Sequence, residues 1–167
     1  MSEIGKIYLR KIENSDIEYV FRGLSHPDVI RHYGVSFSSL EETNAQMEWF
    51  AQAEQEWFAI CSKGNDEFLG ACGFNDISKD HKKAEIGLWL LPEHWGKGIM
   101  KKAMNLICDY GFNKLGLHRI EGFVDNGNTN CKRAMDKLAF AHEGTMRDCE
   151  FKNGQFLSVD IYALIKR

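Results

Sequence analysis

Proline is nearly absent from this chain, with only Pro27 and Pro92 among 167 residues. So little proline, beside 44% apolar and 27% charged residues, is typical of an ordered globular domain. The sequence shows no internal repeat, low-complexity tract or linker that would divide the chain. The length therefore predicts a single domain over residues 1–167.

Three further features are missing, and each excludes a class of protein. No run of 18 apolar residues occurs, and the N-terminus lacks the basic-then-apolar order of a signal peptide, which argues against a membrane location. The formal charge of −3 provides no basic field for nucleic acid. The five cysteines contain no C-x-x-C spacing, and the six histidines have no metal-like spacing. We therefore expect a cytoplasmic protein with no metal and no nucleic-acid or membrane partner.

Hydrophobic periodicity predicts seven strands and four main helices in the order β-α-α-β-β-β-α-β-α-β-β. The expected strands cover 6–12, 57–62, 68–77, 84–91, 118–124, 140–151 and 156–165. The expected helices cover about 15–24, 39–52, 98–115 and 129–138, with a short helical connection over 28–34. The predicted fold class is α/β (mixed α+β), with one central, mostly antiparallel sheet and helices on both faces. A crossover helix makes the two strands beside it parallel.

Local signals mark the ends of several of these elements. Ser15 with Glu18, and Ser39 with Glu42, have capping-box spacing, which predicts two helix starts. The second helix is expected to bury Met47, Phe50 and Ala51. Residues 153–154 are Asn-Gly, which predicts a two-residue hairpin turn. These first two helices either form one wall of a cleft or only cover the sheet.

The chain is organised around residues 84–104, AEIGLWLLPEHWGKGIMKKAM. A short apolar strand ends at Pro92, a glycine loop follows at 95–98, and a helical pattern begins at Ile99. Strand, glycine loop and helix start together form an anion site, because the first helix amides have no internal partner. The alternative is that the glycines only make a tight turn. Lysines at 97, 101 and 102 favour an anion, since cations there oppose the helix dipole.

Glu85 is a single carboxylate inside this apolar strand, on the same face as Gly87 and Trp89. Apolar neighbours desolvate a carboxylate and raise its pKa toward that of a useful general base. The alternative is an ion pair with Lys82 or Lys83 at the beginning of the strand.

Two segments, EIGLWLLPEHWGKGIM at 85–100 and NTNCKRAMDKLAF at 128–140, carry a family resemblance that extends over residues 6–167. The chain resembles the GNAT N-acetyltransferase superfamily, most of all the branch of the ribosomal-protein N-terminal alanine acetyltransferases. That family's Gln/Arg-x-x-Gly-x-Gly/Ala pattern falls here on residues 95–100, with Trp95 in place of the polar residue and Met100 in place of the small one. The resemblance implies a GNAT fold and acetyl-CoA as co-substrate.

The resemblance also implies roles for particular residues. The implied pyrophosphate-binding loop consists of Trp95, Gly96, Lys97, Gly98, Ile99 and Met100. The implied pantetheine contacts are made by Leu90, Leu91 and Asn128. Glu85 corresponds to the base that deprotonates the amine, and the Trp89 amide to the donor that stabilises the oxyanion. Cys131 stands in place of a serine near the thiol; it is either an acid, with a pKa lowered by the helix N-terminus, or a packed, inert residue.

The function implied is acetyl-CoA-dependent N-acetyltransfer to a primary amine by direct transfer in a ternary complex, without a metal. The acceptor is either a protein N-terminus or a small molecule such as a polyamine, an aminoglycoside or an amino sugar. The alternative from another class is a non-catalytic coenzyme A-binding sensor. Monomer and homodimer are both compatible with the sequence.

Overall fold

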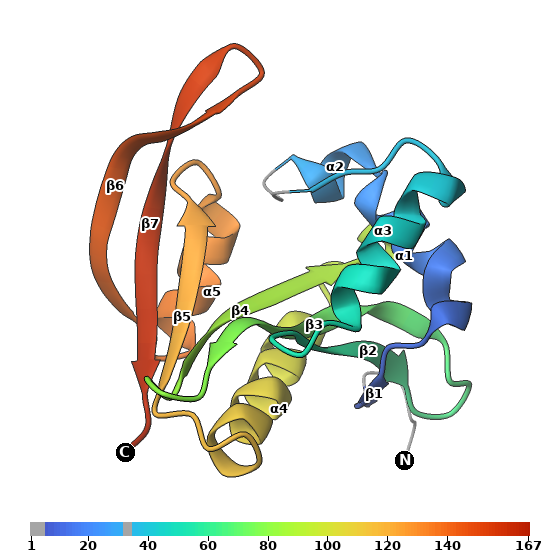
Figure 1. The fold of residues 1–167 in the computed structure, drawn as a ribbon, viewed down its shortest axis with the longest axis horizontal. Coiled ribbons are helices and arrows are strands. Elements are labelled where there is room, and N and C mark those ends of the chain that lie inside the picture. The colour runs from blue at the N-terminus through green and yellow to red at the C-terminus, as the bar shows by residue number, and fades with distance from the viewer. Residues whose placement is uncertain (1–5, 32–34) are drawn as a thin grey trace.

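The computed structural model describes residues 6–31 and 35–167. Its seven strands form one sheet in the order β1-β2-β3-β4-β5-β7-β6, as Figure 1 shows. The strands are β1 (Ile7–Lys11), β2 (Glu56–Ser62), β3 (Phe68–Ser78), β4 (Lys83–Leu90), β5 (Arg119–Asp125), β6 (Ala141–Lys152) and β7 (Gln155–Ile165). The helices are α1 (Ile17–Leu24), α2 (Pro27–Ile30), α3 (Leu40–Phe50), α4 (Ile99–Asn113) and α5 (Thr129–Lys137). Single 3-10 turns η1 (Asn14–Asp16) and η2 (Pro92–His94) complete the order.

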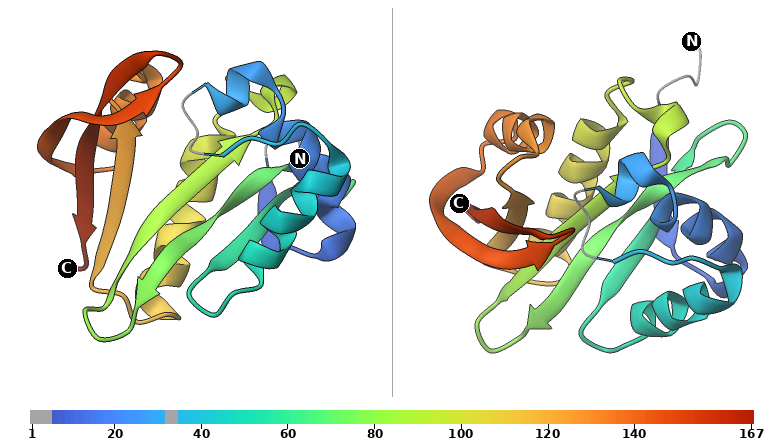
Figure 2. Two further views of the ribbon diagram at one scale, coloured as in Figure 1. Left: turned by 45° about the horizontal axis from the view of Figure 1, so that its top comes forward. Right: turned by 90° about the horizontal axis from the view of Figure 1, so that it is seen from above.

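The sheet is mixed and mostly antiparallel, as predicted, with β4 and β5 as its parallel pair. These two strands pair only over Lys83–Glu85 of β4 and then diverge, so the sheet opens into a V (Figure 1). The strands β5, β6 and β7 with α5 form one arm, and β1–β4 with the other helices form the second (Figure 2). This divergence exposes one edge of β4, because a parallel partner is missing beyond Glu85.

Helices cover both faces of the sheet and bury two separate cores. One core packs α4 and α5 against the sheet around Phe74, Ile107 and Ile120, whose side chains are completely buried. The other packs α1 and α3 against the opposite face around Val20 and Trp57. None of the helices in the described ranges is long and apolar enough to span a membrane.

Three local predictions on the N-terminal helices need correction. Ser15 does not cap α1. The capping box lies two residues earlier, where Glu13 and Asp16 bracket η1, because Arg10 binds the Asp16 carboxylate at 2.7 Å and holds it there. Ala51 is exposed, since α3 ends at Phe50 and Ala51 is its C-cap. The expected helical connection forms as α2 over Pro27–Ile30, and its positions 32–34 lie outside the described residues.

Two other predicted signals, the helix start at Ser39 and the hairpin turn at residues 153–154, are confirmed. The Ser39 hydroxyl accepts the Glu42 amide at 3.1 Å and caps α3. Asn153 and Gly154 have φ values of 52° and 77°, the left-handed geometry of a two-residue hairpin turn. The glycines inside β3 allow close strand approach, because a Cβ at Gly70 would lie 2.2 Å from the Trp89 carbonyl oxygen.

Candidate functional site

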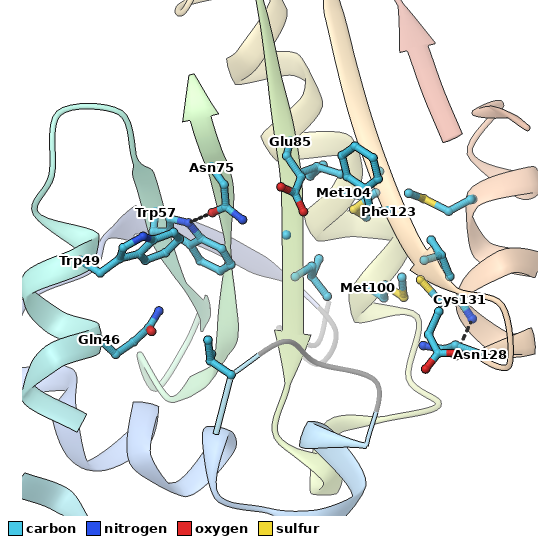
Figure 3. Close-up of a pocket in the computed structure, with 18 of the residues that line it drawn as sticks. Gln46, Trp49, Trp57, Asn75, Glu85, Met100, Met104, Phe123, Asn128 and Cys131 are labelled. Atoms are coloured by element: carbon cyan, nitrogen blue, oxygen red, sulfur yellow. Dashed lines mark hydrogen bonds between the residues drawn. The ribbon is translucent and has the colours of Figure 1, made fainter. Parts of the chain in front are cut away.

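A cleft of about 540 Å³ opens where β4 and β5 diverge. One wall comes from α3, β2 and β3, and the opposite wall from α4, β5 and α5 (Figure 3). Glu85 lies between the two walls on β4. Of the two helices predicted after β1, α3 forms part of a cleft wall, whereas α1 contributes no described lining residue and covers the sheet.

Glu85 sits in a row of polar side chains across three strands. It is the cross-strand partner of Asn75 on β3 and of Glu121 on β5. Burial raises the pKa of Glu85 to about 7, and the negative charges of Asp76 and Glu121 add to this effect. Lys83 pairs with Glu121 at 3.4 Å, and no ion pair to Glu85 occurs within the described part of the chain. The site therefore holds a carboxylate that changes its protonation state near neutral pH.

The exposed edge of β4 presents alternate backbone groups to the cleft. The Leu91 amide donates to the Leu69 carbonyl of β3 at 2.9 Å, whereas the Lys82 carbonyl accepts the His118 amide from the β5 side at 2.7 Å. Backbone direction alternates along a strand. Odd-numbered residues of β4 therefore direct their amides to β3, and even-numbered residues direct theirs to the divergence.

This alternation corrects the role expected for the Trp89 amide. Trp89 is the register partner of Ala71, so its N–H is directed into the β3 ladder and away from the cleft. Its ring is buried at 4% exposure against Gly23 and Phe68. Leu88 has the right direction and lines the cleft, which makes its amide the candidate oxyanion donor.

Leu90 and Leu91, which were expected to contact pantetheine, already use some of their backbone groups in hydrogen bonds within the protein. The Leu91 amide is bonded to β3, and the Leu90 carbonyl accepts the Trp95 indole N–H at 2.9 Å. Trp95 thereby ties the loop before α4 to the end of β4. Its indole takes over a structural role, while the loop beyond it stays exposed at residues 96–98.

The start of α4 has the features of an anion site. Gly96 and Gly98 have φ values of 75° and 76°, and a Cβ at either would meet nothing within 4 Å. The glycines are needed for backbone conformation and leave open space around the loop. No side chain caps α4 and its first turn holds no acidic residue, while Lys97 and Lys101 flank it. Helix amides and cations facing open space fit the pyrophosphate of coenzyme A.

Asn128 and Cys131 line the cleft wall next to Met100, as the close-up shows (Figure 3). Asn128 Oδ1 caps α5 by accepting the Cys131 amide at 3.2 Å, which leaves its side-chain amino group for a ligand. Burial raises the pKa of the Cys131 thiol to about 11. The expected lowering by the helix N-terminus is wrong, because desolvation dominates at this thiol.

The opposite wall contains residues to which the sequence assigned no role. Gln46 and Trp49 come from α3, and Trp57 from β2. The Trp57 indole N–H donates to Asn75 Oδ1 at 2.8 Å, and the Trp49 and Trp57 rings lie 6.2 Å apart. Strand register and helix docking bring these residues to the cleft. In the sequence alone they look like ordinary core residues, so no local signal marks them.

The charges that line the cleft have one sign. Glu85 and Asp125 are its ionisable carboxylates, and no lysine or arginine lies among the described residues that line it. Apolar side chains such as Phe37, Phe123 and Met104 make up most of the remaining surface. Such a lining favours a cationic or neutral acceptor over an acidic one.

Comparison with known proteins agrees with this geometry. Residues 6–141 match the family model described as acetyltransferase (GNAT) domain. N-acetyltransferase YoaA of Bacillus subtilis is 32% identical over 98% of this chain and 96% of its own length. Spermidine N(1)-acetyltransferase of Escherichia coli is 28% identical over 93% and 84%. The structure of spermidine N-acetyltransferase from Vibrio cholerae with CoA and spermine superposes with a TM-score of 0.89, at 22% identity over 96% of this chain and 95% of that one.

These similarities do not single out the ribosomal-protein branch. They do cover nearly the whole chain. The chain belongs to the GNAT family and is an N-acetyltransferase that uses acetyl-CoA as its acyl donor.

Proposed function

We propose that this N-acetyltransferase moves the acetyl group directly to a primary amine while donor and acceptor occupy the cleft together. The observation that carries the proposal is the position of Glu85, with a pKa of about 7, between two differently built walls. The wall of Met100, Asn128 and Cys131 adjoins the anion site and is the donor side. The wall of α3, β2 and β3 is the acceptor side.

Each step follows from groups of this chain. The Glu85 carboxylate takes a proton from the ammonium, directly or through a water molecule, and frees the nitrogen lone pair. The nitrogen then forms a bond to the thioester carbonyl carbon, and the carbon–sulfur bond breaks. The Leu88 amide donates to the carbonyl oxygen where negative charge develops, an effect of about 3 kcal/mol for a well-placed donor. The departing thiolate takes its proton from the amine or from solvent.

The acceptor is an amine in this proposal because the cleft carries carboxylates and no cation among its described lining residues. The similar proteins from Escherichia coli and Vibrio cholerae are named spermidine acetyltransferases, which supports an amine as the acceptor without defining its other groups. An amine must lose a proton before it attacks, and Glu85 is the carboxylate positioned to receive it.

Glu85→Gln tests the proposal. We expect kcat to fall about 100-fold or more, because a glutamine cannot accept the proton. Wild-type kcat should rise with pH through about 7 as Glu85 ionises, and this rise should be absent in the variant. The KM for acetyl-CoA should change little, since Glu85 lies on β4 away from the α4 loop. Rates are measured by thiol release with a panel of primary amines between pH 5.5 and about pH 9.

Glu121→Gln is the matched control, because it removes a neighbouring carboxylate from the same row. It should retain turnover and shift the pH rise to lower values, since one cause of the raised Glu85 pKa is gone. Wild-type rates across pH in Glu85→Gln would remove Glu85 from the mechanism. Coenzyme A binding with no thiol release from any amine would instead favour the non-catalytic sensor.

A further inference from the structure

The acceptor wall contains two side-chain amides, Gln46 on α3 and Asn75 on β3, and only Asn75 is the cross-strand neighbour of Glu85. Gln46 is 8% exposed and extends from α3 toward the cleft (Figure 3). Within the part of the chain that the structure describes, its side chain makes no hydrogen bond. The polar atoms of Gln46 are not among the fully enclosed side-chain atoms without a partner, so they are accessible from the cleft. A ligand that displaces water there must offer Gln46 a polar group, because an unpaired amide costs free energy.

Asn75 has a fixed orientation, which defines what it offers. The Trp57 indole is a donor only, so the atom of Asn75 that it contacts at 2.8 Å must be the carbonyl oxygen. The Asn75 amino group, with its two N–H donors, is thereby turned away from Trp57. Figure 3 shows it on the side of Glu85.

The location of this donor relative to the reacting amine follows from the sheet register. Asn75 and Glu85 are direct cross-strand partners, and such pairs have Cβ atoms about 5 Å apart. A ligand oxygen that accepts from Asn75 is therefore only a few bonds from an amine that loses its proton to Glu85. A second ammonium at this place would face N–H donors, which repel it.

We propose that Asn75 and Gln46 select acceptors that carry a hydroxyl or carbonyl oxygen close to the reacting amine. Amino alcohols, amino sugars and amino-acid amides belong to this class, and simple alkyl amines and alkyl diamines do not. Asn75 donates to the oxygen, and Gln46 bonds the polar group beyond it. The Trp49 ring, which packs beside Trp57, covers the carbon skeleton. This inference rests on the proposed role of Glu85 as the base at this site.

Matched acceptors test the selectivity of the wild-type protein. Ethanolamine and glycinamide carry the oxygen, n-propylamine lacks it, and putrescine replaces it with a second ammonium. We expect kcat/KM for the oxygen-bearing amines to exceed that for the other two by about tenfold or more, because a buried donor left unpaired penalises the wrong ligand. Calorimetric titration of the same amines into the coenzyme A-loaded protein should give the same order, and it does not depend on turnover.

Asn75→Asp provides a switch of specificity. Aspartate keeps an oxygen for the Trp57 N–H but replaces the donor group with a second carboxylate oxygen. The ratio of kcat/KM for ethanolamine to kcat/KM for putrescine should fall about tenfold or more, in favour of the diamine. Asn65→Asp is the control: Asn65 lies in the β2–β3 turn, and its Oδ1 accepts the Glu67 amide, which aspartate also does. It should leave the ratio unchanged.

Gln46→Leu is the second variant, of similar size and without polar atoms. The variant should bind glycinamide more weakly than wild type does. Its affinity for n-propylamine should stay below the affinity of wild type for glycinamide. Thermal midpoints show whether each variant is folded. Equal affinity of wild type for all four amines, or a preference unchanged in both Asn75→Asp and Gln46→Leu, overturns the inference. Failure of the proposed function looks different, since it abolishes thiol release while the order of affinities remains measurable.

Discussion

The Cys131 thiol illustrates how its surroundings decide the chemistry of one residue. It lines the donor wall, but burial raises its pKa to about 11, above the 8.5 of a free thiol. A group that holds its proton so firmly is a weak acid toward a departing thiolate. In this site Cys131 is better suited to packing beside Met100 than to proton transfer.

We therefore predict that Cys131→Ala lowers kcat by less than about threefold at pH 7.5, because no proton passes through the thiol. Cys131→Ser should behave in the same way. The comparison is made by steady-state thiol release with saturating acetyl-CoA. A loss of about 100-fold in the alanine variant that the serine variant restores would reinstate an acid at this position.

At the scale of single residues, the sequence predicts those properties well that depend on a residue's neighbours along the chain. Glu85 is an isolated carboxylate in an apolar run, so its desolvation follows from its immediate neighbours. The direction of the Trp89 amide depends on the register with β3, and the burial of Cys131 depends on helices packed around it. Gln46 reaches the cleft because α3 docks against the sheet, which no local pattern in the sequence indicates.

At the scale of elements, the start of α4 depends on a backbone conformation that glycine adopts without steric cost. Gly98 has a φ of 76° and open space around it, so an alanine there is strained without any steric clash. We predict that Gly98→Ala lowers the free energy of unfolding by about 1 kcal/mol and raises the KM for acetyl-CoA several-fold. The reason for the second effect is that relaxation of φ reorients the first helix amides. Urea unfolding and initial rates measure the two effects.

Gly154→Ala is the matched control for this prediction. Gly154 has a φ of 77°, also with nothing near its absent Cβ, but it lies at the tip of the β6–β7 hairpin. Its loss of stability should be similar, and its KM for acetyl-CoA should equal that of wild type. An equal rise of KM in both variants would mean that general destabilisation, not the loop conformation, controls donor binding.

Element order was predictable because each strand and helix carries its own periodicity and turn signals. The seven strands, the parallel pair and the hairpin at residues 153–154 follow from such signals. The errors fall where a tertiary contact changes a helix end. Arg10 on β1 holds Asp16 and moves the first capping box away from Ser15. The cleft exists because β4 and β5 pair only over Lys83–Glu85. The length of that pairing depends on how the two arms of the sheet pack, which local sequence signals do not indicate.

At the scale of the whole molecule, Asp160 joins the elements of the arm that carries the donor wall. It is 1% exposed on β7 and accepts hydrogen bonds from Thr145 and His142 of β6, from Asn126 after β5 and from Lys132 of α5. The Thr145 hydroxyl, together with the other three donors, holds the pKa of Asp160 well below its usual range despite burial. One carboxylate thus fixes two strands, a loop and the helix that carries Cys131.

Because the folded-state pKa of Asp160 is lowered, its ionisation stabilises the fold above the unfolded-state value of about 3.9. That stabilisation is present at pH 7 and is lost as the pH falls from about 5 toward 2. We predict that Asp160→Asn lowers the free energy of unfolding by about 3 kcal/mol at pH 7, since four donors then face a neutral amide. Urea unfolding should show this difference shrinking below pH 4, whereas Asp80→Asn, in the exposed turn before β4, should leave the pH dependence as in wild type. A difference that stays constant from pH 7 to pH 3 would show that Asp160 acts through shape and not through charge.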